Sequence, residues 1–318
     1  MNILIWHQHG SWLTAFVQGD HRYLVPVLPD RGPDGRGRAR TWDWPASVVE
    51  RTPEQLRDER IDCVIVQRSR DLELLREWTG LEAGVDVPAV WVEHDTPPSV
   101  TSRHPVADRD DLPVVHVTHF NSVAWDNGRA PVHVVEHGVP DPGERWTGEV
   151  GRLAVACNEP VRRERVLGTD LLRHFTAAGH GVDAFGMQVT GLARHLGTDR
   201  VREYEDLPQH AMHDELARRG VYLHLTRWTS LGLSLIEAMM LGLPVVVLAT
   251  TDAVRTVPPE AGAVSTDVGE LVAAAGRLLA DPEAAALAGK AARTAALERH
   301  GLDRFLADWD RLLLEVTR

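Results

Sequence analysis

A single carboxylate interrupts an otherwise apolar segment in the second half of the chain. The segment runs from Thr229 to Leu248 with the sequence TSLGLSLIEAMMLGLPVVVL, and Glu237 is its only charged residue. A buried carboxylate without partners is energetically costly, so Glu237 should accept hydrogen bonds. Two interpretations are open: Glu237 binds hydroxyl groups of a ligand, or it pairs with an internal arginine or caps a neighbouring backbone segment.

The turn in front of this carboxylate is built from small residues and leads into a helix. We expect a strand over Val221–Leu225, a turn over residues 227–232, and a helix that begins near Leu233. The first turn of a helix has free backbone N–H groups at the positive end of the helix dipole, which suits a phosphate. The backbone N–H groups of Gly232, Leu233 and Ser234 are therefore candidates for phosphate or sugar binding, and Gly232 allows a close approach.

A second candidate for anion binding is an arginine-rich turn after the strand expected at Leu153–Cys157. The sequence RRERVLG, from Arg162 to Gly168, precedes a predicted helix. Arg163 and Arg165 are candidates for binding a diphosphate, because the guanidinium fork matches phosphate oxygens. The alternative is a solvated basic turn, as on many charged protein surfaces.

Three features of the N-terminal half carry side chains suited to a ligand. His94 follows an apolar strand and lies either on a loop at the strand end or in the core as a hydrogen-bonded histidine. His7 and His9 have the spacing of a metal pair, but no acids or cysteines with ligand spacing accompany them, which favours polar contacts without a metal. The loop Asp30–Arg40, DRGPDGRGRAR, holds four arginines. It is a cationic patch for an anionic acceptor or for a negative neighbouring element, or a mobile solvated loop.

Composition and charge limit the classes of function. The 318 residues, 43% hydrophobic and 25% charged, indicate a globular chain long enough for two domains. A net charge of −12 makes nucleic-acid binding a poor candidate function. No apolar run reaches the roughly 18 residues of a membrane span, and the first residues predict a strand rather than a signal peptide. Cys63 and Cys157 lie in expected strands, which disfavours a disulfide framework, so we expect a cytoplasmic protein.

Short aliphatic strands alternate with helices along both halves, which predicts parallel sheets covered on both faces. The strands expected in the first half are Ile3–Trp6, Tyr23–Val27, Asp62–Val66, Ala89–Val92, Val114–Val117 and Val132–Val135. Those expected in the second half are Leu153–Cys157, Val182–Phe185, Val221–Leu225, Pro244–Leu248 and Ala263–Ser265. The segment 140–150, PDPGERWTGEV, is interpreted as a linker. We therefore predict an α/β protein with two doubly wound domains, residues 1–145 and 146–300, followed by a helical segment 301–318, with a ligand cleft between the domains.

The opening segment resembles the donor-sugar motif of family-4 retaining glycosyltransferases, which have the two-domain GT-B fold. In that family a glutamate is followed by seven residues, a second glutamate, an alanine-rich turn and Gly-x-Pro-Val-Val. The matching residues here are Gly232-Leu233, Glu237-Ala238-Met239 and Gly242-Leu243-Pro244-Val245-Val246. Two positions depart from the family pattern. Thr229 replaces the first glutamate, which contacts hydroxyls of the donor sugar, and Asn158 lies where the family has a diphosphate-binding arginine.

The resemblance extends over nearly the whole chain and is weaker towards the N-terminus. Met1–Trp6 with Gly10-Ser11 resembles the first strand and the glycine loop that lies against the donor diphosphate. AVWVEHDT, residues 89–96, resembles the strand that ends in the family's active-site histidine, here His94. VVEHGV, residues 134–139, resembles the segment before the hinge, and Asp303–Val316 resembles the helix that crosses back to the N-terminal domain.

The resemblance implies a metal-independent, retaining transferase that moves a sugar from a nucleotide diphospho-sugar to a hydroxyl acceptor, without a further cofactor. It assigns a catalytic role to His94 and Thr229. It assigns binding of the donor to Gly10, Arg163, Arg165, Gly232, Leu233, Ser234 and Glu237. The N-terminal domain would hold the acceptor, which the arginine loop suggests is anionic. One alternative is a non-catalytic sugar-nucleotide-binding homologue or partner subunit, and another is a GT-B epimerase or phosphorylase. The base, the sugar, the acceptor and the oligomeric state are left open.

Overall fold

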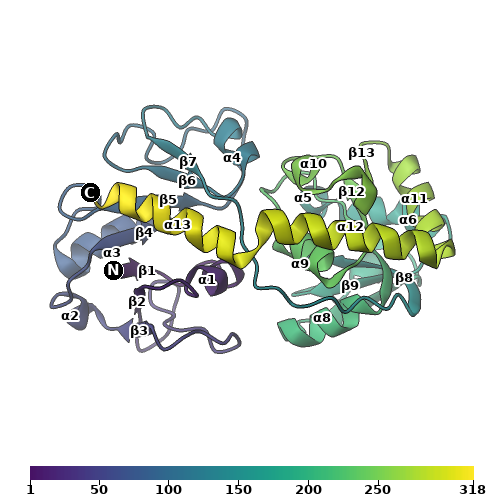
Figure 1. Cartoon of the computed structure of the whole chain (residues 1–318), viewed down its shortest axis with the longest axis horizontal. Coiled ribbons are helices and arrows are strands. Elements are labelled where there is room, and N and C mark those ends of the chain that lie inside the picture. Colours follow the sequence, from purple (N-terminus) through teal and green to yellow (C-terminus); the bar gives the residue numbers. More distant parts are fainter. The chain divides into compact units, whose positions relative to one another are not determined.

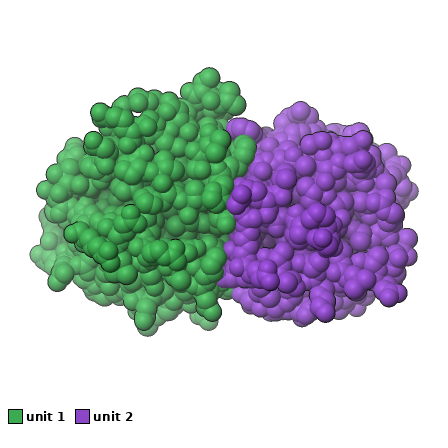
Figure 2. All heavy atoms as spheres, turned by 45° about the horizontal axis from the view of Figure 1, so that its top comes forward, with its two compact units in different colours: residues 1–140, 302–318 green, residues 141–301 purple.

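Each half of the chain folds around an all-parallel β-sheet with helices on its faces (Figure 1). The computed structural model describes residues 1–318. It divides into two compact units, one formed by Met1–Pro140 with Leu302–Arg318 and the other by Asp141–Gly301 (Figure 2). The division after Pro140 lies a few residues before the boundary expected after residue 145. None of the helices combines the length and the apolar character that a membrane span requires.

Unit 1 has a seven-stranded sheet in the order β3-β2-β1-β4-β5-β6-β7. Its strands are β1 (Asn2–Ile5), β2 (Arg22–Pro26), β3 (Val48–Arg51), β4 (Cys63–Val66), β5 (Ala89–Glu93), β6 (Val114–His116) and β7 (Val132–Val134). Its helices are α1 (Gly10–Phe16), α2 (Pro53–Leu56), α3 (Ser69–Thr79), α4 (His119–Ala124) and α13 (Leu302–Val316). The strand order reverses between β1 and β4, which places a crevice at the carboxyl ends of these neighbouring strands.

Unit 2 repeats the same topology with six strands in the order β10-β9-β8-β11-β12-β13. The strands are β8 (Val150–Ala156), β9 (Val182–Gly186), β10 (Val201–Glu205), β11 (Arg219–His224), β12 (Val245–Leu248) and β13 (Gly262–Ser265). The α-helices are α5 (Glu164–Leu167), α6 (Leu172–Ala177), α7 (Leu192–Leu196), α8 (Gln209–Ala217), α9 (Leu233–Leu241), α10 (Ala253–Thr256), α11 (Val268–Ala280) and α12 (Pro282–His300). Short 3-10 turns occupy Thr169–Leu171 and Pro259–Ala261. Here the order reverses between β8 and β11.

All the strands expected from aliphatic runs are present, and two strands were not expected. The unexpected strands are β3 and β10, and each is an edge strand of its sheet. Half or more of the residues in VVER and VREYE are charged, and most of their residues are only half-buried or exposed. An edge strand is not covered like a central one, so it does not need the continuous apolar run by which parallel strands are recognised.

The last helix, α13, completes the core of unit 1. Trp309 is 1% exposed, and its ring packs edge-on against Trp12 and Phe16 of α1, with centroids 5.7 and 5.0 Å away. A Cβ on Gly138 would lie 2.2 Å from the Cβ of Phe305, so the chain before the unit boundary passes directly against this helix. These contacts explain why residues 302–318 belong to unit 1 although they are remote in sequence (Figure 1).

Because Trp309 fills the space between α1 and α13, we expect Trp309→Ala to lower the free energy of unfolding of unit 1 by about 3–5 kcal/mol, the usual cost of removing a buried aromatic ring. Leu314→Ala on the same helix is the control, because Leu314 is 54% exposed. Urea denaturation followed by tryptophan fluorescence measures both. Equal midpoints for the two variants would show that α13 does not contribute to the core.

Candidate functional site

The residues predicted to bind a diphosphate follow two neighbouring strands of unit 2. The carboxyl ends of β8 and β11 lie side by side, because these strands pair in parallel register. Arg163 follows β8, whereas Thr229 and the Gly232–Ser234 backbone follow β11. This edge is the point where the strand order reverses, and ligands of open α/β sheets bind there. The fold therefore places Arg163, Thr229 and the Gly232–Ser234 backbone after two paired strands, at the edge where a crevice is expected.

Glu237 lies in α9, is 4% exposed, and is held by two side chains of α8. The Nε2 atom of Gln209 donates to its Oε1 atom over 2.9 Å. The Nε2 atom of His213 lies 3.2 Å from its Oε2 atom, within ion-pair distance but without hydrogen-bond geometry. Neither an internal arginine nor a backbone cap accounts for this carboxylate. An ionised carboxylate has about four acceptor positions, so capacity remains for ligand hydroxyls.

The first turn of α9 is an uncapped helix terminus. Gly232 is the N-cap residue, and no side chain caps the helix. The backbone N–H groups of Gly232, Leu233 and Ser234 donate to no group of the protein, as expected for the first turn of a helix. The Oγ atom of Ser234 accepts a hydrogen bond of 2.9 Å from the Tyr222 hydroxyl, which fixes this turn against β11. These free donors, at the positive end of the helix, form an anion-binding geometry.

His224, the last residue of β11, occupies the space left by the missing side chain of Gly232. A Cβ on Gly232 would lie 2.8 Å from the Cε1 atom of His224. Gly232 has φ −71°, so the glycine is required for space rather than for backbone conformation. Burial lowers the pKa of His224 to about 4, so the ring is neutral at physiological pH. The sequence offered no signal for this histidine, because it ends an ordinary apolar strand.

The arginines of the turn after β8 differ in whether their charges are already paired. Arg165 pairs with Asp170 at 2.9 Å, and its side chain is 75% exposed. Arg227 also pairs with Asp170 and donates to the Arg165 carbonyl, which ties the loop after β11 to this turn. Arg162 pairs with Glu159.

Arg163 is half-buried, and no hydrogen bond or ion pair engages its guanidinium. Burial raises the pKa of the neighbouring Cys157 thiol to about 12, and the charge of Arg163 acts in the opposite direction. The positive charge of Arg163 therefore lies close to the end of β8. Of the two predicted arginines, Arg163 is the one whose charge is free for a ligand, whereas Arg165 stabilises the turn.

Thr229 lies in the middle of the loop after β11. Its side chain is half-buried, and its hydroxyl makes no hydrogen bond within the protein. The hydroxyl can therefore both donate to and accept from a ligand. A glutamate at this position would only accept, so the substitution changes the chemistry of the contact as well as its charge.

In unit 1, His94 is a buried histidine with a defined partner. It follows β5, is 7% exposed, and its Nε2 atom lies 3.0 Å from the Oε1 atom of Gln67. The Nε2 atom of Gln67 donates to the Trp6 carbonyl, so the side chain of Gln67 spans the ends of β1, β4 and β5. Burial, and then the neighbouring His9 and His137, hold the pKa of His94 well below its ordinary value. His94 is therefore a neutral group, and its Nε2–H donates to Gln67.

His7, His9 and Gly10, which follow β1, contact different neighbours. The ring of His9 stacks on His94 with centroids 3.9 Å apart, whereas His7 packs on Trp44 at 4.8 Å. No group of three or more histidine, cysteine or acidic side chains is arranged to hold a metal ion. A Cβ on Gly10 would lie 2.3 Å from the Trp42 ring, so that ring covers the glycine at the start of α1.

A known sequence family matches part of unit 2. Residues 185–295 match the family model described as Glycosyl transferases group 1. This segment contains the loop after β11 and Glu237, and it excludes Arg163 and His94. No curated protein sequence matches the chain significantly.

Solved structures match over both units. HepE of Anabaena in complex with UDP is 14% identical, with a TM-score of 0.71 over 99% of this chain and 100% of that chain. Sucrose-phosphate synthase of Thermosynechococcus elongatus is 14% identical, with a TM-score of 0.73 over 99% of each chain. A glycosyltransferase of Rickettsia africae is 12% identical, with a TM-score of 0.70 over 100% of this chain and 98% of that chain. At these identities the likeness establishes the fold, two Rossmann-like domains as in GT-B glycosyltransferases.

The buried, neutral His224 gives a pH prediction. Its folded pKa of about 4 lies below the ordinary 6.5. Between pH 6.5 and 4 this histidine is therefore protonated in the unfolded chain but neutral in the folded chain. Stability from this group is complete above pH 6.5 and is lost as the pH falls towards 4. Between pH 7.5 and 5.0 we expect the wild type to lose about 2 kcal/mol more than His224→Gln, measured by urea denaturation. An equal loss in both proteins would show that His224 titrates normally.

Proposed function

We propose that the chain is a retaining glycosyltransferase that moves a sugar from a nucleotide diphospho-sugar to a hydroxyl acceptor, with the donor held by unit 2. One observation carries the proposal. The unpaired Arg163 and the uncapped first turn of α9 follow β8 and β11, which pair at the strand-order reversal of unit 2, and the buried carboxylate of Glu237 lies one turn further along α9. The match of residues 185–295 to Glycosyl transferases group 1 supports it.

In this proposal the diphosphate is bound by the N–H groups of Gly232, Leu233 and Ser234 and by Arg163. Negative charge develops on the diphosphate as the bond to the sugar breaks, and fixed dipoles and a cation aimed at that charge lower the barrier. Because the protein supplies this positive charge, the proposed mechanism does not require a metal ion. Glu237 accepts from the ribose hydroxyls, and Gln209 and His213 hold its carboxylate in place for that contact.

Thr229 is proposed to contact the donor sugar. Its free hydroxyl supplies one neutral hydrogen bond in place of a charged one, so the preferred donor should be a sugar that needs no carboxylate at that position. In unit 1, His94 is proposed to be a catalytic residue and Gly10 a donor contact, because of the resemblance to family-4 glycosyltransferases. The nucleotide base is proposed to be uracil, as structures of the fold neighbour HepE contain UDP or UDP-glucose.

A second candidate function is a non-catalytic sugar-nucleotide binder, and the observation that favours it is the missing carboxylate at position 229. The two functions share the same donor contacts and differ only in turnover. Product analysis over a panel of UDP-, GDP-, ADP- and dTDP-sugars separates them, with hydrolysis followed as well as transfer. Tight donor binding by the wild type without any turnover would support the non-catalytic binder and contradict the transferase function.

Arg163→Ala should weaken UDP binding by about 1.5–3 kcal/mol, the range for a charge-assisted hydrogen bond, and should leave uridine binding unchanged. Arg165→Ala is the matched control, because its guanidinium already pairs with Asp170 at 2.9 Å. Isothermal titration calorimetry with UDP and uridine measures both ligands. Equal effects of the two variants, or an equal loss of uridine binding, would mean that Arg163 does not contact the diphosphate.

For the transferase, Thr229→Ala should lower kcat/KM by about 2- to 13-fold, which corresponds to roughly 0.5–1.5 kcal/mol for one neutral hydrogen bond. Thr229→Glu should change the order of donor preference, because the site then gains an acceptor and loses a donor. Steady-state kinetics over the donor panel provide the measurement. An unchanged donor order and an unchanged kcat/KM in both variants would place Thr229 outside the donor site.

A further inference from the structure

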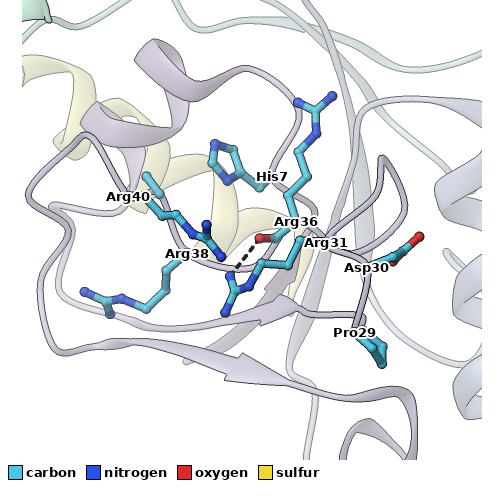
Figure 3. Close-up of a pocket in the computed structure, with 8 residues that line it drawn as sticks. His7, Pro29, Asp30, Arg31, Arg36, Arg38 and Arg40 are labelled. Carbon is cyan, nitrogen blue, oxygen red and sulfur yellow. Dashed lines mark hydrogen bonds between the residues drawn. The ribbon is translucent and has the colours of Figure 1, made fainter.

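A cavity of about 400 Å³ in unit 1 concentrates positive charge in an otherwise acidic protein. It is bounded by His7, at the carboxyl end of β1, and by the loop 29–40, and four arginines line it (Figure 3). These are Arg31, Arg36, Arg38 and Arg40. The cavity lies wholly within unit 1 and shares no residue with the donor crevice of unit 2 described above.

Two of the four arginines fix the loop. Arg31 forms a bidentate pair with Glu50 at 2.8 and 3.1 Å and donates to the Arg36 carbonyl over 3.0 Å (Figure 3). Arg38 donates to the carbonyls of Trp44 and Pro45 over 2.6 and 2.9 Å. Although burial alone raises the pKa of Glu50, its bonds to Arg31 and to the Arg38 backbone bring that pKa below the ordinary value. Glu50 is therefore ionised, and the loop is held by a charged network.

The other two arginines keep their charges free. Arg36 and Arg40 are exposed, and their guanidinium groups take part in no hydrogen bond or ion pair of the protein. Asp30 is the only acid that lines the cavity. Figure 3 shows its carboxylate directed away from the guanidinium groups of Arg31 and Arg40. A fixed loop that presents two unpaired guanidinium groups suits an oxyanion, since guanidinium forks match carboxylate, sulfate and phosphate oxygens.

His7 adds an acceptor beside these cations. Its Nδ1 atom lies 2.9 Å from the Gly37 carbonyl oxygen, which can only accept, so Nδ1 carries the proton and Nε2 carries a lone pair. Burial lowers the pKa of His7, the Arg36 charge lowers it further, and the bond to Gly37 acts in the opposite direction. The ring is therefore neutral at physiological pH and can accept a hydrogen bond from a ligand hydroxyl.

We propose that this cavity binds the acceptor, and that the acceptor is a hydroxylated molecule bearing an oxyanion, such as a sugar phosphate, a sugar sulfate or a uronic acid. Arg36 and Arg40 bind the oxyanion, and the Nε2 atom of His7 accepts from a hydroxyl of the same molecule. As a binding site the cavity stands on its own geometry, whereas its role as the acceptor site rests on the proposed glycosyltransferase function.

The test is calorimetric titration of the full chain with glucose 6-phosphate, glucose 6-sulfate, glucuronate and uncharged glucose. We expect at least one charged ligand to bind tenfold or more tightly than glucose, and the Arg36→Gln/Arg40→Gln double variant to lose that difference. The Arg194→Gln/Arg202→Gln double variant is the control, because both arginines are exposed on unit 2 and form no side-chain ion pair. The order of the three charged ligands identifies which oxyanion the site prefers.

Wild-type affinities equal to that of glucose for all three charged ligands would overturn the inference. So would a preference that survives in the Arg36→Gln/Arg40→Gln variant, or one lost equally in the control. UDP titrations of the same proteins separate this result from the proposed function. The double variant should bind UDP as the wild type does, and a wild type that binds glucose 6-phosphate but not UDP would refute the donor site while the anion site stands.

Discussion

The burial of one carboxylate within an apolar helix is the constraint on which the C-terminal unit depends. Glu237 is 4% exposed, and an unsatisfied charge at that depth would cost several kcal/mol. On helix α8, Gln209 donates a hydrogen bond to this carboxylate, and His213 lies within ion-pair distance of it. The same helix, α9, begins with uncapped N–H groups, and Arg227 and Thr250 tie the loop in front of it to neighbouring turns. The Glu237 carboxylate and the backbone in front of α9 are thus held by the protein itself, and fixed dipoles of this kind are what electrostatic stabilisation of a leaving group requires.

The two units share one topology but carry different side chains at the carboxyl ends of their central strands. In unit 2 the loops after β8 and β11 present a free cation and free N–H groups. In unit 1 the corresponding edge carries neutral histidines, with Gln67 linking the end of β1 to His94. The arginine loop beside it divides its four cations between two that build the loop and two that remain free. The protein is acidic overall, with a net charge of −12, so local pairing decides where positive charge is available.

Sequence patterns predicted the fold well and some of the elements that carry the candidate site. Apolar runs located the central strands, and the turn before Leu233 located the helix terminus, because both are local signals. The edge strands β3 and β10 were missed since partial exposure removes that signal. The partners of Glu237 lie on another helix, with Gln209 28 positions away, and no local pattern indicates such a contact. Charge spacing likewise could not separate the unpaired Arg163 from Arg165, whose partner Asp170 becomes apparent only in the folded turn.

The proposed function requires unit 2 to bind a nucleoside diphosphate through the first turn of α9, Arg163 and Glu237. A crystal structure of the full chain with UDP tests it most directly. We expect phosphate oxygens within hydrogen-bond distance of the Gly232–Ser234 N–H groups and of the Arg163 guanidinium, with the ribose hydroxyls on Glu237. A nucleotide bound elsewhere, or one whose ribose lies away from a Glu237 still engaged only by Gln209 and His213, would contradict it.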